Sequence, residues 1–184
     1  PEAGGHLGFS RQDLDAPPSL SDLLREVLTA IAPFRDKAGR DIPVFVAGGV
    51  KNGADIARYM KLGAAGAQFA TRFIATVECD ASDGYKQRLL NASPGDITLV
   101  KSPVGMPGRA LRSPLIRRVE DGTQPPPDRC MKCITTCDGK NAPYCISRAL
   151  IAARNGDWEN GLFFCGAAGG EVNTLSTVPE QMAQ

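Results

Sequence analysis

The fold is decided by residues 43–73, which read PVFVAGGVKNGADIARYMKLGAAGAQFATRF. Residues 42–47 form a short apolar run that ends in two glycines, a pattern typical of a strand buried on both faces. A helix is expected over about residues 53–62, and residues 65–70 read as the next strand. A strand, a helix and a strand this close together connect most simply as a right-handed parallel unit. Alternating units of this kind predict α/β architecture.

The segment before this stretch predicts a helix that covers the sheet. Ser19 or Ser21 can cap a helix that extends to about Phe34, because a serine hydroxyl accepts a hydrogen bond from a free N–H group of the first turn. One apolar stripe with helical spacing runs along it and comprises Leu20, Leu23, Leu24, Val27, Leu28 and Ile31. This stripe gives the helix a face to pack on the sheet.

Two loops end the two predicted strands at the same edge of the sheet. Gly48-Gly49 follows the first strand and Ala70-Thr71 follows the second, and parallel strands end side by side. Backbone N–H groups in such loops, unobstructed at the glycines, can surround a phosphate, and Thr71 can add a hydroxyl donor. The pairing favours phosphate binding over two plain flexible loops.

The N-terminal segment reads PEAGGHLG and contains His6, the only histidine of the sequence. Gly5 and its neighbours allow the backbone to turn sharply or to lie against a flat ligand, where the imidazole could move a proton. The alternative is a tight turn with a solvated imidazole. The segment begins abruptly, without a preceding strand or helix cap, so we expect the chain to be a piece of a longer protein.

Composition limits the partners of the protein. The 184 residues are 42% hydrophobic and 22% charged, as in an ordinary globular protein. Because 21 Lys and Arg stand against 20 Asp and Glu, the net charge of +1 indicates neither nucleic acid nor an acidic membrane surface as a partner, and it leaves the oligomeric state open. The sequence has no bilayer-spanning apolar run and no signal peptide, so we expect a cytoplasmic protein.

The middle of the chain predicts a separate, looser lobe. Between residues 76 and 128, prolines interrupt every long helix except one near residues 81–90. A run without acidic residues carries Lys101, Arg109, Arg112, Arg117 and Arg118. Such a run either attracts an anionic substrate or is a solvated face, and Met106 within it either lines a pocket or fills space.

Four of the six cysteines follow the pattern Cys130-x2-Cys133-x3-Cys137-x7-Cys145. Four thiols could bind Zn²⁺ or an iron–sulfur cluster, but the later intervals do not fit a zinc ribbon, and reduced loop thiols are the favoured interpretation. Cys165 lies in an apolar stretch and is expected in the core. A helix is expected over residues 146–155.

Several motifs taken together resemble the nitronate monooxygenase family, formerly called 2-nitropropane dioxygenases. They are PEAGGHLG, residues 43–73, ECDAS, KSPVGMPGRA and GLFFCGAAGGEVNTLSTVPE, in the family's order. The family consists of FMN-dependent barrels, so the resemblance implies the C-terminal half of a (β/α)₈ TIM barrel with an inserted smaller substrate lobe. It divides the chain into the half barrel at 1–75, the lobe with its Cys-rich segment at 76–145 and a return to the barrel at 146–184.

The resemblance also implies roles for individual residues. His6 would be the catalytic base or polarising group beside the flavin, and Lys101 and Met106 would face the substrate. Ala70 stands where the family usually has glycine, and its methyl group could move that loop away from the phosphate. The residues expected to bind FMN are Gly5, Gly48, Gly49, Gln68, Ala70, Thr71 and Gly166.

The sequence therefore favours FMN-dependent oxidation of small-molecule nitroalkanes or alkyl nitronates by O₂. An alternative flavoenzyme is an enoyl-acyl-carrier-protein reductase that uses NAD(P)H as its reductant. Outside the enzymes, the alternatives are an inactive barrel fragment or a metal-binding module built on Cys130, Cys133, Cys137 and Cys145. A relative of IMP dehydrogenase is disfavoured, because that chemistry needs a nucleophilic cysteine in a loop near the phosphate site.

Overall fold

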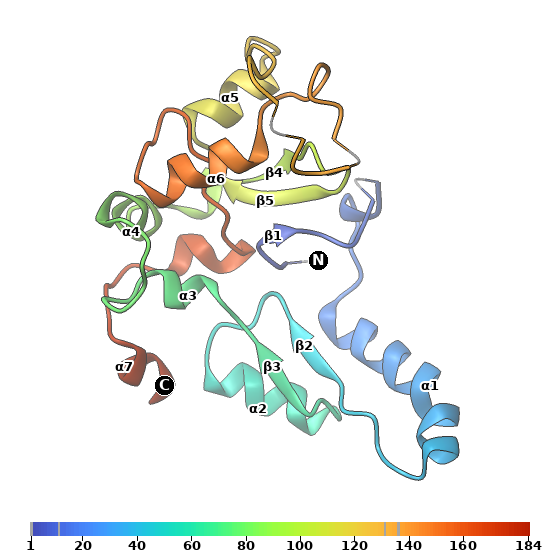
Figure 1. Cartoon of the computed structure of the whole chain (residues 1–184). Helices are drawn as coiled ribbons and strands as arrows, with labels where there is room; N and C mark the ends of the chain where they lie inside the picture. The colour runs from blue at the N-terminus through green and yellow to red at the C-terminus, as the bar shows by residue number, and fades with distance from the viewer. Residues whose placement is uncertain (1, 11, 131, 136) are drawn as a thin grey trace.

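The computed structural model describes residues 2–10, 12–130, 132–135 and 137–184. Its helices and strands, in chain order, are β1 (Gly5–His6), α1 (Leu20–Ala38), β2 (Phe45–Ala47), α2 (Gly53–Lys61), β3 (Gly66–Gln68), α3 (Thr71–Ile74), α4 (Asp83–Leu90), β4 (Ile97–Lys101), β5 (Pro107–Leu111), α5 (Pro114–Glu120), α6 (Ile146–Arg154) and α7 (Val178–Met182). Three short 3₁₀ turns lie at Gln12–Leu14, Pro94–Asp96 and Ala167–Glu171. In Figure 1, α1, β2, α2 and β3 form the lower part, and β1, β4, β5, α5 and α6 form the upper part.

The predicted strand–helix–strand unit is confirmed. β2 pairs with β3 in parallel, and the register ends with Ala47 opposite Gln68. α2 begins after Asn52, whose side chain accepts a hydrogen bond from the Asp55 N–H, and Gly63 follows its end with a φ of +105°. The left-handed backbone at Gly63 is the conformation in which helices commonly end.

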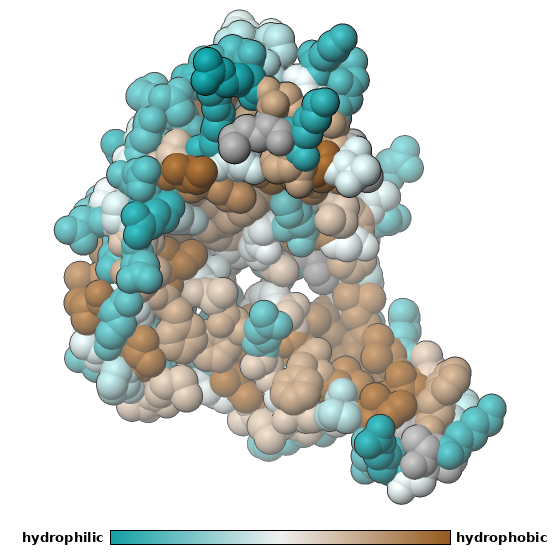
Figure 2. All heavy atoms as spheres, viewed as in Figure 1, coloured by the Kyte–Doolittle hydropathy of each residue, from teal (hydrophilic) through white to brown (hydrophobic). Residues whose placement is uncertain are grey.

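The expectation that the first strand is buried on both faces is wrong. Val46 is only 4% exposed, because it packs in one buried cluster with Leu24 of α1 and Tyr59 of α2, whereas Phe45 on the opposite face is 63% exposed. Figure 2 shows apolar side chains gathered over α1 and the β2–β3 sheet. α1 is capped by Ser19 as predicted, since the Ser19 hydroxyl accepts a hydrogen bond from the Asp22 N–H at 3.1 Å. The exposed large apolar side chains in this region include Val27, Phe34, Ile42, Phe45 and Met60.

An antiparallel sheet that the sequence did not predict forms the centre of the upper part. β4 and β5 make a hairpin, and β1 pairs with the other edge of β5, with His6 opposite Gly108. The strand order is therefore β1-β5-β4. β5 begins at Pro107 and contains Gly108, two residue types that are depleted in strands. Two of the prolines that suggested irregular structure, Pro107 and Pro114, instead mark the starts of β5 and α5.

Three groups of buried side chains hold the molecule together. The first, around Val46, joins α1, β2 and α2. The second lies around Phe163 and includes Cys165, which confirms that this cysteine is a core residue, and the third lies around Ile116 between β4, β5, α5 and α6. Within the residues that the structure describes, none of the helices combines the length and the apolar character needed to cross a membrane.

Candidate functional site

A cavity of about 350 Å³ lies between the β2–β3 sheet and the segments that flank β1 and follow α6. Its volume falls within the roughly 300–1,000 Å³ range of small-molecule sites. Residues 2–5, 47–51, 68–72 and 164–166 form most of its lining, and Figure 2 shows the surface hollowed between the upper and lower parts. Every residue expected to bind FMN lies in this lining, namely Gly5, Gly48, Gly49, Gln68, Ala70, Thr71 and Gly166.

The parallel register brings the two predicted phosphate loops together. Because Ala47 is opposite Gln68, the residues that follow each strand share one edge of the sheet. Gly48 and Gly49 have φ values of +92° and +73°, which residues with a side chain rarely adopt. A Cβ atom on Gly48 would lie 2.6 Å from the backbone nitrogen of Ala3. The glycine pair therefore allows the N-terminal segment to lie directly against this loop.

The segment around Gly166 closes the cavity by hydrogen bonds to the loop at Thr71 and to the N-terminal segment. The Gly166 N–H donates to the Thr71 hydroxyl at 2.8 Å, and the Ala167 N–H donates to the Glu2 carbonyl at 3.0 Å. A Cβ atom on Gly4 would lie 2.6 Å from the carbonyl carbon of Cys165. Thr71 thus accepts a hydrogen bond from the chain while its own hydroxyl proton can still be donated to a ligand.

Charged residues at the cavity were missed in the sequence. Lys51 lines it and forms an ion pair with Glu171 at 2.6 Å, and this hydrogen bond raises the pKa of Lys51. Glu2 also lines the cavity, and its carboxylate adds to the stabilisation of the Lys51 ammonium. The position of Lys51, two residues after Gly48-Gly49, was a signal that could have identified it as a phosphate-binding cation.

His6 lies next to the cavity but outside its lining. Its strand neighbour Gly5 and its ring neighbour Phe164 both line the cavity, and the Phe164 ring meets the imidazole edge-on with centroids 5.3 Å apart. Nε2 of His6 forms a 2.7 Å hydrogen bond with the hydroxyl of Ser102, which is buried. Partial burial lowers the pKa of His6, so the imidazole is predominantly neutral at pH 7.

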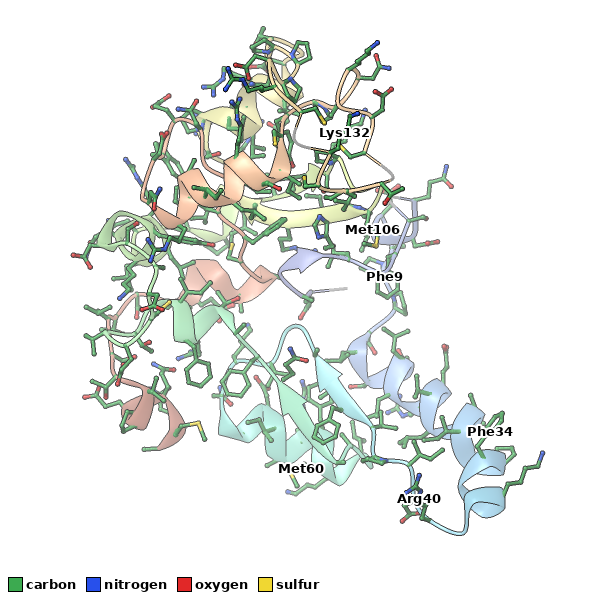
Figure 3. The ribbon with its side chains drawn as sticks, in the orientation of Figure 1. Phe9, Phe34, Arg40, Met60, Met106 and Lys132 are labelled. Atoms are coloured by element: carbon green, nitrogen blue, oxygen red, sulfur yellow. The ribbon has the colours of Figure 1, made fainter. Side chains whose placement is uncertain are left out.

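The other predicted substrate residues lie at the end of the β4–β5 hairpin beside His6. Lys101 is exposed and ends β4, and its carbonyl accepts a hydrogen bond from the Tyr144 hydroxyl at 3.0 Å. Met106 is 45% exposed at the hairpin end (Figure 3). Neither residue lines the cavity, and they form instead part of the surface next to the imidazole.

Most of the expected basic run is engaged within the protein. Arg109 is half-buried and donates to the Ala3 carbonyl at 2.8 Å, so it holds the N-terminal segment in place. Arg112 pairs with Glu120 at 2.7 Å. Ion pairing of this kind reduces the positive field that the sequence alone suggested.

The four clustered cysteines lie away from this cavity, in the segment between α5 and α6. All four carry free thiols, and all four line a second, much smaller cavity, as do Ile134 and Tyr144. The pKa of the Cys137 thiol is raised by desolvation and then by the neighbouring Cys130, Cys133 and Cys145. The spacing pattern in the sequence therefore corresponds to a real cluster in space.

Comparison with known proteins supports a common ancestry for this arrangement. The family model described as nitronate monooxygenase matches residues 1–184. The (3aS,4S,5R,7aS)-5-hydroxy-7a-methyl-1-oxo-octahydro-1H-indene-4-carboxyl-CoA dehydrogenase of Mycobacterium tuberculosis is 35% identical over 123 residues, which are 67% of this chain and 31% of that protein. A nitronate monooxygenase of Paraburkholderia phytofirmans is 32% identical over 126 residues, which are 68% of this chain and 32% of that protein.

Solved structures agree with this similarity over the whole chain. FabK from Thermotoga maritima superposes with a TM-score of 0.69 at 27% identity, over 99% of this chain and 50% of that one. The nitroalkane oxidase from Streptomyces ansochromogenes gives a TM-score of 0.66 at 26% identity, over 99% of this chain and 48% of that one. The matches thus span about a third of the curated relatives and about half of the solved chains, and the chain has the α/β fold of a partial TIM barrel.

Proposed function

The chain belongs to the nitronate monooxygenase family, and from this premise we propose that it is part of an FMN-dependent enzyme that oxidises alkyl nitronates or nitroalkanes with O₂. Within that enzyme, this chain would bind the phosphate of FMN. The observation that carries the proposal is that every residue expected to bind FMN lines one cavity. We further propose that residues 76–145 form the lobe that covers the substrate, between the half barrel at 1–75 and the return at 146–184.

The lining of the cavity fits the two chemically different ends of FMN. Backbone N–H groups around Gly49 and Thr71 are suited to the phosphate, and Lys51 adds a cation beside them. Gly4 allows the N-terminal segment to lie against the backbone of Cys165, and Gly5 leaves room for a flat ring, because a Cβ atom at Gly5 would meet nothing within 4 Å. When bound, the flavin supplies the redox chemistry, since it takes electrons from the substrate and passes them to O₂.

The protein's own contribution to the reaction is the handling of a proton. His6 is neutral at pH 7, and a neutral imidazole can remove the proton from the carbon that carries the nitro group. The hydrogen bond to Ser102 fixes the orientation of the ring, and the edge contact with Phe164 restricts it from a second side. Lys101 at the neighbouring hairpin end offers positive charge to a substrate that is already an anion.

A substrate pair tests the role of His6. We expect His6→Asn to leave flavin content unchanged and to lower turnover of a neutral nitroalkane by about 100-fold or more. Turnover of the pre-ionised nitronate should fall far less, because its proton has already been removed. An equal loss on both forms of the substrate would exclude His6 as the base.

A second candidate function is the oxidoreduction of acyl thioesters with NAD(P)H. It is favoured by the Mycobacterium tuberculosis relative, whose name describes a carboxyl-CoA dehydrogenase, and by the structural similarity to FabK. NAD(P)H oxidation that depends on an enoyl or carboxyl thioester, together with no turnover of nitroalkanes, would establish this function in place of the first.

A further inference from the structure

The segment between α5 and α6 is unusual for its length and its lack of regular structure. α5 ends at Glu120 and α6 begins at Ile146, and the described residues between them form neither helix nor strand. Loops longer than about 12–15 residues without secondary structure are uncommon in compact domains and are usually functional. The backbone hydrogen bonds within it are local, such as those from Asn141 and Ala142 to the carbonyl of Asp138.

The four cysteines of this segment border the same small cavity. Cys130, Cys133, Cys137 and Cys145 together line a cavity of about 20 Å³, which is room for roughly one water-sized body. Cys137 and Cys145 are partly buried, while Cys130 and Cys133 are exposed. Cys145 immediately precedes α6, so one of the four thiols is anchored by a regular element.

The backbone around the first two cysteines has an uncommon conformation. Lys132, between Cys130 and Cys133, has a φ of +51° and is the one non-glycine residue with positive φ among those described. Its N–H donates to the sulfur of Cys130 at 3.4 Å. A Cβ atom on Gly139 would lie 2.7 Å from the same sulfur, so a glycine is needed for Cys130 to pack there. N–H groups directed at sulfur stabilise a thiolate.

We propose that Cys130, Cys133, Cys137 and Cys145 bind a thiophilic metal centre that holds this segment in place. Each thiol would release its proton to solvent on binding, and four thiolates complete a tetrahedral site for Zn²⁺. The described side chains include no group of three or more that is already positioned to hold a metal ion. Cys130 and Cys133 are the exposed pair, so these two thiols would move inward on binding, and Cys133 would exchange its 3.3 Å contact with the Ser147 hydroxyl for the metal.

The segment, together with the start of α6, has a small excess of positive charge beside the cluster. Arg129, Lys132 and Lys140 lie within it and Arg148 lies just after it, against Asp121, Asp128 and Asp138, of which Asp128 pairs with Arg148. The size of the cavity fits a single ion, whereas an iron–sulfur cluster would require the segment to open.

The proposed centre is connected to the candidate active site through one side chain. Tyr144 lines the cysteine cavity and donates its hydroxyl proton to the carbonyl of Lys101, the residue before Ser102. Ser102 in turn bonds His6. The metal centre would thus support the hairpin end that positions the imidazole, but the inference is independent of which substrate the enzyme uses.

Metal analysis of the protein, purified under argon without chelators, tests the proposal. We expect one zinc per chain, and iron with an equal amount of acid-labile sulfide would contradict the single-ion site. Cys137→Ser should lower the affinity for the metal by at least about tenfold. Cys79→Ser is the matched control, because Cys79 is also a partly buried free cysteine but lies outside the cluster, and it should retain the metal.

A cobalt titration keeps the test decisive if the Cys137→Ser protein does not fold. Co²⁺ added to the metal-free wild-type protein should produce the intense charge-transfer absorption of thiolate ligands, saturating at one equivalent. A wild-type protein that contains no zinc and develops no such band would overturn the proposal. Equal affinity for the metal in the Cys137→Ser and wild-type proteins would overturn it too.

Discussion

Replacing Gly48 by alanine tests whether the first loop must approach the N-terminal segment as closely as the structure shows. The φ of +92° at Gly48 makes any side chain strained by about 1–2 kcal/mol. The new Cβ would also lie 2.6 Å from the nitrogen and 3.1 Å from the Cα of Ala3. Overlap with backbone cannot be relieved by a rotamer change, and it adds roughly 1–3 kcal/mol.

Gly122→Ala is the matched control for this substitution. Gly122 has a φ of +69°, and a Cβ atom there would meet nothing within 4 Å. It lies just after α5 and does not line the cavity, so its substitution introduces the strain without the overlap. Comparing the two variants separates the contribution of the contact with Ala3 from that of backbone conformation.

The assay combines urea unfolding with flavin titration. We expect the free energy of unfolding to fall by about 1–2 kcal/mol in Gly122→Ala and by at least about 1 kcal/mol more in Gly48→Ala. The displaced residues 2–3 line the cavity, so Gly48→Ala should weaken flavin binding by about tenfold, or ~1.4 kcal/mol, while Gly122→Ala should not. Equal flavin affinity in the two variants would refute the assignment of this loop to the cofactor.

Three further predictions concern the charges and hydrogen bonds around the cavity. Because burial lowers the pKa of His6, turnover of neutral nitroalkanes should rise with pH through a midpoint below 6.5 and then level off; a pH profile of kcat/KM that keeps this rise in His6→Asn would contradict the prediction. Lys51→Met should weaken flavin binding severalfold, and by more at low than at high salt, because it removes the cation beside the phosphate. Glu171→Gln is the control, because it leaves the Lys51 ammonium in place. A loss of flavin affinity in Lys51→Met that does not depend on salt in a titration series would argue against a phosphate contact. Tyr85→Phe removes a buried hydroxyl that donates to the Phe164 carbonyl at 2.6 Å, so urea unfolding should show a loss of about 1 kcal/mol, and no loss would mean that water replaces the hydroxyl.

The sequence predicted the lower part of the molecule well because its signals are local. The run ending in Gly48-Gly49, the helix after it and the strand ending at Ala70-Thr71 differ clearly in periodicity, and their parallel pairing follows from their spacing. The face of β2 that carries Phe45 is exposed, because local pattern reports how apolar a strand is but not which neighbours cover it.

The upper part could not be predicted because its contacts are distant in sequence. β5 contains Pro107 and Gly108 and lacks a clear alternation, so that only its pairing with β1 and β4 defines it as a strand. The partner of His6 is Ser102, which lies 96 residues away, and no spacing rule connects the two. The cysteine spacing did indicate a cluster, but that Cys145 joins the other three depends on where α6 begins.

The most direct measurement is a crystal structure of the protein reconstituted with FMN. We expect the phosphate within hydrogen-bonding distance of the backbone at Gly49 and Thr71, and the flat ring between Gly5 and Phe164 on the side where His6 lies. A flavin bound elsewhere, or one whose ring is turned away from His6, would contradict the proposed function.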